Sequence, residues 1–319
     1  MTEFPIRQVR LPGDDSEEGA TFWVDAEEQS GSKEKRWCVD LKTNDRYLLK
    51  LARPNTGEDW AELLACEIAG DLFGLPHASV ELASFDDRPA ILTKFFPGPN
   101  EQLMHGSDLL LERDANYPSQ DVRRVRQHTL EAVLEVLGRV RCPAVKNLPA
   151  AVHSAADLFC GYIVFDVLIG NTDRHHQNWG VLAKREEGRA RTLTLAPTYD
   201  HGSSLGRELQ DTERIQRLTG TDRRYSLSSY AQRATSAFFR DAADPRPLRC
   251  GELLEHVSER LPKPFRSWMA RLAENNLALT FEGLVQRVPE QRMSRVAKEF
   301  AVRLLADNAR TIINLGESL

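Results

Sequence analysis

The sequence predicts an α+β fold with two lobes, an N-lobe at residues 1–98 built on a small antiparallel sheet and a larger, mainly helical C-lobe at residues 99–319. Short runs rich in apolar and β-branched residues, separated by turn-forming residues, fill the first ~100 positions. The run FPGPN at 96–100, with two prolines and a glycine, is typical of a connector. Beyond it, apolar residues recur mainly at helical spacing.

Within the N-lobe we expect strands, one helix and further strands, preceded by an irregular lead-in at residues 1–20. Turn-rich segments such as TND separate the first strands, which predicts an antiparallel meander. The helical pattern EDWAELLACEIAGDLF is followed by Gly-Leu-Pro, a sequence that ends a helix. The expected elements are strands at 21–26, 36–41 and 46–53, a helix at 58–73, and strands at 78–85 and 89–96.

The C-lobe has two clear helical patterns in its first half. HTLEAVLEVLGRV, at 128–140, has apolar residues at helical spacing. A second helix is predicted at 154–169, where Ser154 and Asp157 have the spacing of a capping box. Two short strands, GVLA and TLTLAP, flank the charged turn KREEGR. Past residue 207 the pattern is helical with polar loops.

Composition and charge are those of an ordinary globular protein. Of 319 residues, 41% are hydrophobic and 28% are charged, enough for a sizeable core without a sign of global disorder. The formal charge is −5 and no long basic run occurs, so no direct nucleic-acid partner is expected. The longest apolar run is interrupted by Asp166, and no membrane span is expected. Five cysteines without a C-x-x-C pair indicate reduced thiols in the cytoplasm, not disulfides or a zinc site.

Polar residues of particular types follow the second helix, in the run GNTDRHHQNWG. Asp173 and Asn178 are five residues apart, a second acid, Asp200, follows in LAPTYDHGSS, and Lys50 lies upstream in the mostly apolar strand YLLKL. Phosphoryl transfer from ATP needs these types: a lysine for phosphate oxygens, a carboxylate for the attacking hydroxyl, and an asparagine and a second carboxylate for Mg²⁺. Protein kinases have them in this order and with this five-residue spacing. We therefore expect a protein-kinase-like fold that uses ATP and Mg²⁺.

The helix after Lys50 offers a partner for that lysine. On a helical wheel of ~100° per residue, Glu67 falls inside the apolar stripe that contains Trp60, whereas Glu62 falls on the opposite face. A carboxylate on a buried face needs a partner, because burying it unpaired is costly. The pattern predicts a Lys50–Glu67 ion pair like the strand-lysine to helix-glutamate pair of kinases, although Asp71 also falls near the stripe, at the helix end.

GNTDRHHQNWG together with LAPTYDHGSS resembles the C-terminal kinase domain of the HipA-like toxin kinases, in which a D-x-H-x-x-N loop is followed by a P-x-Y-D segment. The resemblance implies an ATP-dependent serine/threonine protein kinase. It also suggests a translation-linked protein substrate and an antitoxin protein as partners. The implied roles are Asp173 as the catalytic aspartate, His175 as a residue that shapes the catalytic loop, Lys50 on the ATP phosphates, and Asn178 and Asp200 as magnesium ligands.

The hinge-like run TKFFPGPNEQLMHG also fits this family, and the adenine is expected against four residues in sequence: Thr93, Lys94, Phe95 and Phe96. The stretch upstream of Lys50 holds no G-x-G-x-x-G motif, and its nearest glycine is Gly31 in QSGSKEK. The family places an autophosphorylated serine in that loop, which makes Ser30 and Ser32 candidate autophosphorylation sites.

Three other interpretations stay open from the sequence. The D-R-H-x-x-N loop is similar to that of phosphatidylinositol kinases, which favours a small-molecule or lipid acceptor. A nucleotide-binding pseudokinase or adaptor would keep the fold without the transfer, although the presence of Asp173, Asn178 and Asp200 argues against it. His175 and His176 with the two aspartates could form a metal-dependent hydrolase site, although adjacent histidines tend to point apart.

Overall fold

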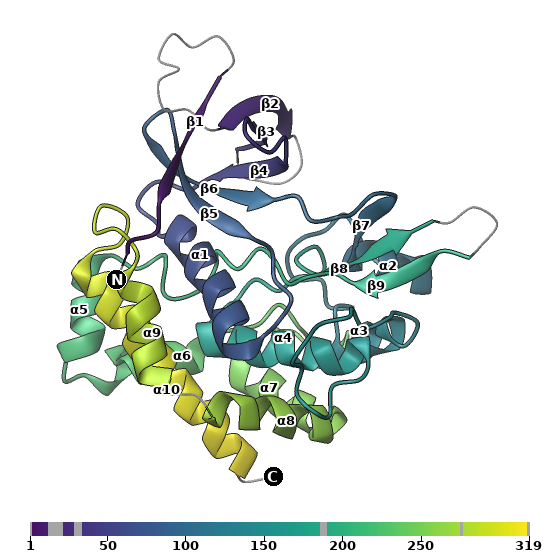
Figure 1. Cartoon of the computed structure of the whole chain (residues 1–319). Coiled ribbons are helices and arrows are strands. Elements are labelled where there is room, and N and C mark those ends of the chain that lie inside the picture. The colour runs from purple at the N-terminus through teal and green to yellow at the C-terminus, as the bar shows by residue number, and fades with distance from the viewer. Residues whose placement is uncertain (1, 12–21, 29–33, 186–189, 275–276, 318–319) are drawn as a thin grey trace.

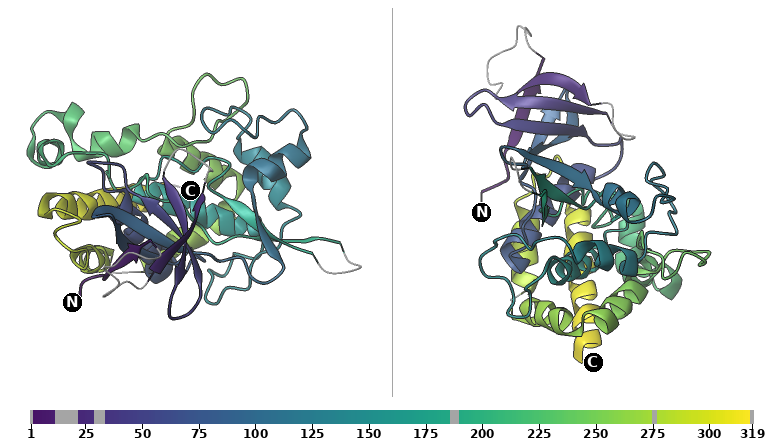
Figure 2. Two further views of the ribbon diagram at one scale, coloured as in Figure 1. Left: turned by 90° about the horizontal axis from the view of Figure 1, so that it is seen from above. Right: turned by 90° about the vertical axis from the view of Figure 1, so that its right-hand side faces the viewer.

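The computed structural model describes residues 2–11, 22–28, 34–185, 190–274 and 277–317. A sheet-rich N-terminal part lies at one end of the molecule, and helices make up most of the remainder (Figure 1). In the right-hand view of Figure 2 the strands of the N-terminal part lie above the helical part, and the C-terminus lies at the opposite end of the molecule. The predicted division into a sheet-rich first part and a helical second part is confirmed. The predictions at Ser30, Gly31 and Ser32 fall outside the described residues.

Six strands of the N-terminal part form a closed barrel in the order β1-β2-β3-β4-β6-β5. They are β1 (Ile6–Arg10), β2 (Phe22–Glu28), β3 (Lys35–Asp40), β4 (Arg46–Leu51), β5 (Val80–Phe85) and β6 (Arg88–Lys94). Apolar side chains such as Phe22, Leu49 and Leu92 fill the barrel. Because side chains alternate along a strand, Leu48 and Lys50 of β4 face away from this interior.

β1 corrects the prediction of an irregular lead-in and of a purely antiparallel sheet. It pairs in parallel with β5, from Ile6 opposite Leu82 to Val9 opposite Phe85, and with the start of β2. The other strand pairs are antiparallel, as predicted. IRQVR holds only two apolar residues, so its pattern is too weak to predict a strand. Pairing along both edges compensates for that weak pattern.

The helix of the N-terminal part, α1 (Glu58–Ile68), continues into a π-helical turn (Ala69–Phe73) and ends at Gly74, which is left-handed with φ 65°. Together they match the predicted helix at 58–73. α1 packs against β5 and β6 and also against α9 (Leu277–Gln286). It is therefore buried on nearly all sides instead of along a single apolar stripe.

A second sheet lies where the two parts meet. β7 (Glu101–His105), β8 (Gly180–Lys184) and β9 (Thr192–Leu195) form a three-stranded antiparallel sheet. The sequence predicts β8 and β9 but not β7, which follows the FPGPN connector directly. β8 begins two residues after Asn178, so this sheet fixes the end of the D-x-x-x-x-N loop.

The C-terminal part is mainly helical, as predicted. Besides α9 and a 3-10 turn (Arg223–Tyr225), its helices are α2 (Gly106–Arg113), α3 (Leu130–Leu137), α4 (Ala155–Ile169), α5 (Asp211–Thr219), α6 (Leu227–Arg233), α7 (Cys250–Arg260), α8 (Pro262–Ala273) and α10 (Arg295–Glu317). Among the described residues, none of the helices has the length and apolar character needed to cross a membrane.

α4 is the central helix of this part and contacts α3, α7, α8 and α10. The predicted capping box begins it: Ser154 Oγ accepts from Asp157 N (3.1 Å), and Asp157 Oδ2 accepts from Ser154 N (2.9 Å). Gly170, left-handed with φ 65°, ends it. Past its first turn, α4 carries one charged residue, Asp166, which is buried and therefore needs a partner.

Gly161 lets α4 approach α8 closely. A Cβ atom at Gly161 would lie 2.4 Å from Trp268 Cε2, whereas a Cβ at Gly251 of α7 would meet nothing within 4 Å. We expect Gly161→Ala to lower the free energy of unfolding by about 1–3 kcal/mol, because the buried indole must move. Gly251→Ala, the matched control, should be neutral or stabilising by up to about 1 kcal/mol. Urea denaturation measures both, and equal midpoints would contradict a steric role for Gly161.

Candidate active site

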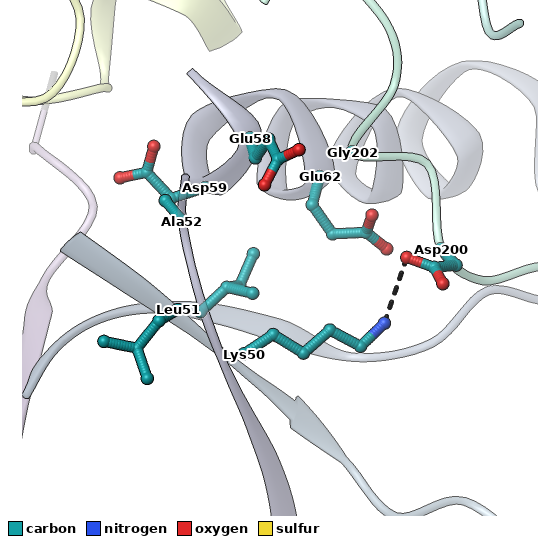
Figure 3. A pocket seen from close by; sticks show the side chains of 9 residues that line it. Lys50, Leu51, Ala52, Glu58, Asp59, Glu62, Asp200 and Gly202 are labelled. Carbon is teal, nitrogen blue, oxygen red and sulfur yellow. Dashed lines mark ion pairs between the residues drawn. The ribbon is translucent and has the colours of Figure 1, made fainter. Parts of the chain in front are cut away.

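Lys50 of β4 reaches across the junction between the two parts to Asp200, in the segment after β9. Its Nζ lies 3.1 Å from Asp200 Oδ1 (Figure 3). Burial by itself lowers the pKa of Lys50, but the carboxylates of Asp200 and Glu62 outweigh this effect and raise that pKa above its ordinary value. Lys50 is therefore a cation at neutral pH, in a pocket also lined by Ile91 and Gly202.

Glu62 is the α1 carboxylate beside this lysine. Figure 3 shows its carboxylate pointing to the Lys50–Asp200 pair, and the side chain is almost completely buried. Burial acts to raise the pKa of Glu62, yet His201 and Lys50 outweigh it and lower that pKa below its ordinary value. The junction therefore holds a lysine between two negative carboxylates.

Glu67, the predicted partner of Lys50, lies elsewhere. Its Oε2 is 3.8 Å from Arg287 Nη1, in the segment after α9. The predicted Lys50–Glu67 pair is wrong because α1 is buried on several sides. The centre of its apolar stripe therefore does not identify the face that looks toward β4, and Glu62, on the opposite side of the wheel, occupies that face.

A further network joins the start of α1 to the segment after Asp200. Glu58 is buried, and its Oε1 accepts from Arg53 Nη1 (2.7 Å) and Arg207 Nη1 (2.5 Å). Gly202 permits the close approach, because a Cβ at this position would lie 3.3 Å from Glu58 O. No sequence motif marks these partners, since Arg207 lies 149 residues after Glu58 in the chain.

The D-x-x-x-x-N loop closes on itself through hydrogen bonds. Asn178 Nδ2 donates to Asp173 O (2.7 Å), and Asp173 N donates to Asn171 Oδ1 (3.1 Å). Because the amide nitrogen of Asn178 holds the loop, its amide oxygen is the atom that can bind a cation. The Asp173 side chain is 51% exposed, and its Oδ2 accepts from Ser203 Oγ (3.5 Å). The loop thus presents a fixed backbone and an accessible carboxylate.

Arg174 fixes this loop from the core side. Its guanidinium binds Asp166 of α4 through two parallel hydrogen bonds, Nε to Oδ2 and Nη2 to Oδ1, both 2.7 Å. It also donates to Asn178 O (2.6 Å), Thr198 Oγ1 (2.9 Å) and Tyr199 O (3.3 Å). Both charged side chains are nearly inaccessible, so each depends on the other. One arginine thereby ties α4, the loop and the P-x-Y-D segment together.

His201, next to Asp200, extends this network to α1. Its Nε2 lies 2.7 Å from Thr198 Oγ1, and its Nδ1 lies 3.6 Å from Glu62 Oε1. The ring is fully buried and packs edge-on against Phe165 of α4. Asp200 itself is left-handed, with φ 59°, a conformation that aspartate tolerates better than most residues. The D-H-G segment is therefore held between α4 and α1.

The two adjacent histidines have different partners, and their ring planes are at 89° to each other. His175 Nδ1 accepts from Gln177 N (3.2 Å), and its Nε2 lies 4.0 Å from Asp173 Oδ1. His176 Nδ1 lies 2.7 Å from Tyr117 OH. Burial lowers the pKa of His175 and lowers that of His176 to about 4. Neither histidine belongs to a group of three potential metal ligands in the described part of the chain, so this geometry does not favour the hydrolase.

Two of the four predicted adenine-contacting residues lie toward the junction. Thr93 is buried opposite Leu48, on the same face of the sheet as Lys50. Within the described residues, its Oγ1 has no hydrogen-bond partner. Phe96 packs against Tyr199 of the C-terminal part, with ring centroids 5.9 Å apart. Both positions suit contact with a ligand at the junction.

The other two predicted adenine-contacting residues, Lys94 and Phe95, have side chains that contact other residues of the N-terminal part. Lys94 Nζ binds Asp45 Oδ2 at 2.6 Å. Phe95 is 42% exposed and packs edge-on against Trp37 of β3. Trp37 lies opposite Leu48 and so shares the face that carries Lys50. No motif in the sequence identifies it, because its position follows from strand register alone.

The comparisons with known proteins agree with the motifs found in the sequence. A family model described as HipA-like C-terminal domain matches residues 27–265. The chain belongs to this family. The matched range contains the strand lysine, the D-x-x-x-x-N loop and Asp200. A search among curated proteins finds no significant match.

Solved structures with the same fold include a bacterial kinase, CtkA, and a HipA protein. The Helicobacter pylori proinflammatory kinase CtkA superposes with a TM-score of 0.68 and 21% identity, covering 91% of this chain and 92% of CtkA. Shewanella oneidensis HipA, solved with HipB and operator DNA, gives a TM-score of 0.54 and 11% identity, covering 92% of this chain and 67% of HipA. At these identities the likeness concerns the fold alone.

Arg174→Gln would leave Asp166 buried without its counter-charge. We expect the free energy of unfolding to fall by about 3–5 kcal/mol, the usual effect of breaking a buried pair. Arg224→Gln is the matched control, because Arg224 pairs with Asp222 at the surface and is 84% exposed; its unfolding midpoint should not move. Urea denaturation compares the two, and an equally small effect at Arg174 would contradict its structural role.

Proposed function

We propose that this member of the HipA-like family is a protein kinase that transfers the γ-phosphoryl group of ATP to a serine or threonine hydroxyl. The observation that carries the proposal is the meeting of Lys50 and Asp200 at 3.1 Å beside a loop in which Asn178 binds Asp173 O at 2.7 Å. These residue types, in this order, are those that phosphoryl transfer needs. The family match and the fold shared with CtkA support the same function.

ATP would bind at the junction, with its phosphates at Lys50. Asp200 and Asn178 offer a carboxylate and an amide oxygen, the hard ligands that Mg²⁺ prefers, so these residues fit the metal. Bound Mg²⁺ would neutralise charge that develops on the phosphates. The Asp200 carboxylate is 29% exposed, which leaves it accessible to an incoming cation. Lys50 already holds this carboxylate in position.

The adenine would lie against the face of the barrel that carries Lys50, near residues 93–96. Thr93 supplies a buried hydroxyl without a partner among the described residues, which is suited to a polar atom of the base. Trp37, on the face that carries Lys50, and Phe96, which packs against Tyr199, supply aromatic surface. Binding of a flat heterocycle by aromatic contacts and one polar group is typical of small-molecule sites.

Asp173 would orient the acceptor hydroxyl and accept its proton. Its backbone is held by Asn171 and Asn178, and Arg174 anchors the loop to α4. The carboxylate therefore keeps its position while it stays accessible to an acceptor. His175, beside it and neutral at pH 7 because burial lowers its pKa, would shape the loop without adding charge.

In this proposal the chain is a two-lobed kinase whose lobes are residues 1–98 and 99–319, joined by the connector between β6 and β7. The solved HipA is in complex with HipB. An antitoxin-like protein is the corresponding proposed partner here, and a translation-linked protein the proposed substrate. The five cysteines are free, in keeping with a cytoplasmic location. Autophosphorylation at Ser30 or Ser32 remains a prediction.

Asp173→Ala tests the chemistry directly. We expect incubation of the wild type with Mg-ATP to add phosphoryl groups to the chain or to serine- and threonine-containing peptides. The variant should be slower by about 100-fold or more, because the carboxylate that assists proton transfer is lost. Intact mass spectrometry measures the incorporation, and peptide mapping then locates it.

Asp241→Ala, at an exposed loop position, is the control and should retain full incorporation. Equal incorporation into the Asp173→Ala variant would exclude Asp173 from the chemistry. Phosphate found on lipid or metabolite acceptors and never on protein would replace the proposed acceptor class. Normal ATP binding without any transfer would favour the pseudokinase.

Glu62→Gln and Glu67→Gln form a second matched pair, on one helix. Removing the charge of Glu62 takes away one of the two carboxylates beside Lys50, and we expect kcat/KM to fall by about 10- to 100-fold. Glu67→Gln should stay within about twofold, because its partner is Arg287. Steady-state kinetics with Mg-ATP measures both. A larger loss at Glu67 would restore the pairing that the sequence predicts.

A further inference from the structure

Near the Lys50–Asp200 pair, three side chains of different chemistry lie close together. Glu62, Cys66 and His201 each offer one potential ligand atom, and these atoms lie within 4.8 Å of one another. His201 Nδ1 is 3.6 Å from Glu62 Oε1 and 3.9 Å from Cys66 Sγ. All three residues are buried. Within the described ranges of the chain, no second group of this kind occurs.

We propose that Glu62, Cys66 and His201 form a binding site for Zn²⁺ or a similar borderline-soft divalent cation. Thiolate, imidazole and carboxylate are the ligands that zinc binds in proteins, whereas Mg²⁺ prefers oxygen alone. The site is therefore chemically distinct from the magnesium ligands proposed above, Asn178 and Asp200.

The spacing suits such an ion. With a Zn–S bond of about 2.3 Å and a Zn–N bond of about 2.0–2.1 Å, sulfur and nitrogen on one ion can lie up to about 4.4 Å apart. The observed 3.9 Å between Cys66 Sγ and His201 Nδ1 is within that limit. At a tetrahedral zinc the carboxylate oxygen would lie about 3.6 Å from the sulfur. Because the three ligand atoms lie within 4.8 Å of one another, the Glu62 side chain would need to shift by about 1 Å at most to join them.

The outer hydrogen bonds orient the imidazole for this role. His201 Nε2 lies 2.7 Å from Thr198 Oγ1, which also accepts from Arg174 Nη2 (2.9 Å). A hydroxyl oxygen can accept two hydrogen bonds, so Thr198 Oγ1 can also accept a hydrogen bond from the Nε2–H group of His201. In that tautomer, which a bound cation would favour, the lone pair of Nδ1 would be directed at an ion between Glu62 and Cys66. Metal-binding histidines usually have such a partner on the second ring nitrogen.

A cation would also satisfy a polar atom that is otherwise costly to bury. Glu62 Oε1 has no hydrogen-bond partner among the described residues. The Cys66 thiol is neutral, because burial raises its pKa well above the ordinary value. On binding, the thiol would release its proton to solvent and the sulfur would bond to the metal. Of the three residues, Glu62 also lines the small pocket that contains Lys50, so a cation from solvent would approach from that side.

Occupation of the site would draw Glu62 away from Lys50 and so inhibit phosphoryl transfer. This consequence rests on the proposed kinase function, whereas metal binding itself does not. The cluster would then make activity sensitive to a trace metal at a position that the nucleotide does not occupy.

Cobalt titration of the metal-free full chain tests binding, because a Co²⁺–thiolate bond gives an intense near-ultraviolet band. We expect one equivalent of Co²⁺ to produce the band and Zn²⁺ to abolish it. Cys66→Ser should lose the band and bind Zn²⁺ at least about tenfold more weakly. Cys160→Ser, which changes another fully buried thiol, in α4, should keep both. Cys66→Ala repeats the test if the serine hydroxyl disturbs folding.

Absence of the band in the wild type, or equal Zn²⁺ affinity in Cys66→Ser, would overturn the site. In parallel, Zn²⁺ at fixed Mg-ATP should lower phosphorylation by the wild type at least about tenfold, reversibly by a chelator, with Cys66→Ser resistant. The band without inhibition would overturn the regulatory consequence alone. A metal-free wild type that never transfers phosphate would instead be a failure of the proposed function.

Discussion

The buried pair between Arg174 and Asp166 fixes the two segments that carry Asp173, Asn178 and Asp200. A guanidinium has five N–H donors, and all five of those of Arg174 are used: two on Asp166 and three on other acceptors. A buried charge is tolerable when its hydrogen bonds are complete, because desolvation is then compensated. The acceptors belong to separate segments, so one saturated side chain fixes their relative position.

A second constraint is the balance of charge around Lys50. Asp200 approaches from the C-terminal part and Glu62 from α1, so the cation lies between two anions that belong to different elements. Each element would hold an uncompensated charge if it moved away alone. Electrostatics therefore favours the closed junction before any nucleotide binds. In the proposed kinase, the phosphates and Mg²⁺ of the nucleotide would enter a site whose charges are already arranged.

Sequence patterns predict the local structure better than they predict partnerships between distant segments. Most strands, α1 and α4 follow from periodicity, turns and capping residues, while β1 carries too few apolar residues to be recognised. Lys50, Asp173 and Asn178 can be proposed from the sequence because their types and spacing suit one chemistry. Glu62 is missed because a helix buried on several sides has no single inner face. The sequence points to Arg174 only indirectly. Asp166 is a single acid in an apolar helix, which implies that a cationic side chain pairs with it but does not identify that side chain.

Closure of the barrel by β1 has a consequence for recognition. An open sheet ends in a strand with free backbone donors and acceptors, to which another chain can add a strand of its own. In the described residues, β1 pairs with both β2 and β5, so the barrel has no such terminal strand. Proteins that dock on this part of the chain must bind its side chains and loops. Their specificity would then depend on surface residues that can vary without disturbing the hydrogen bonds of the sheet.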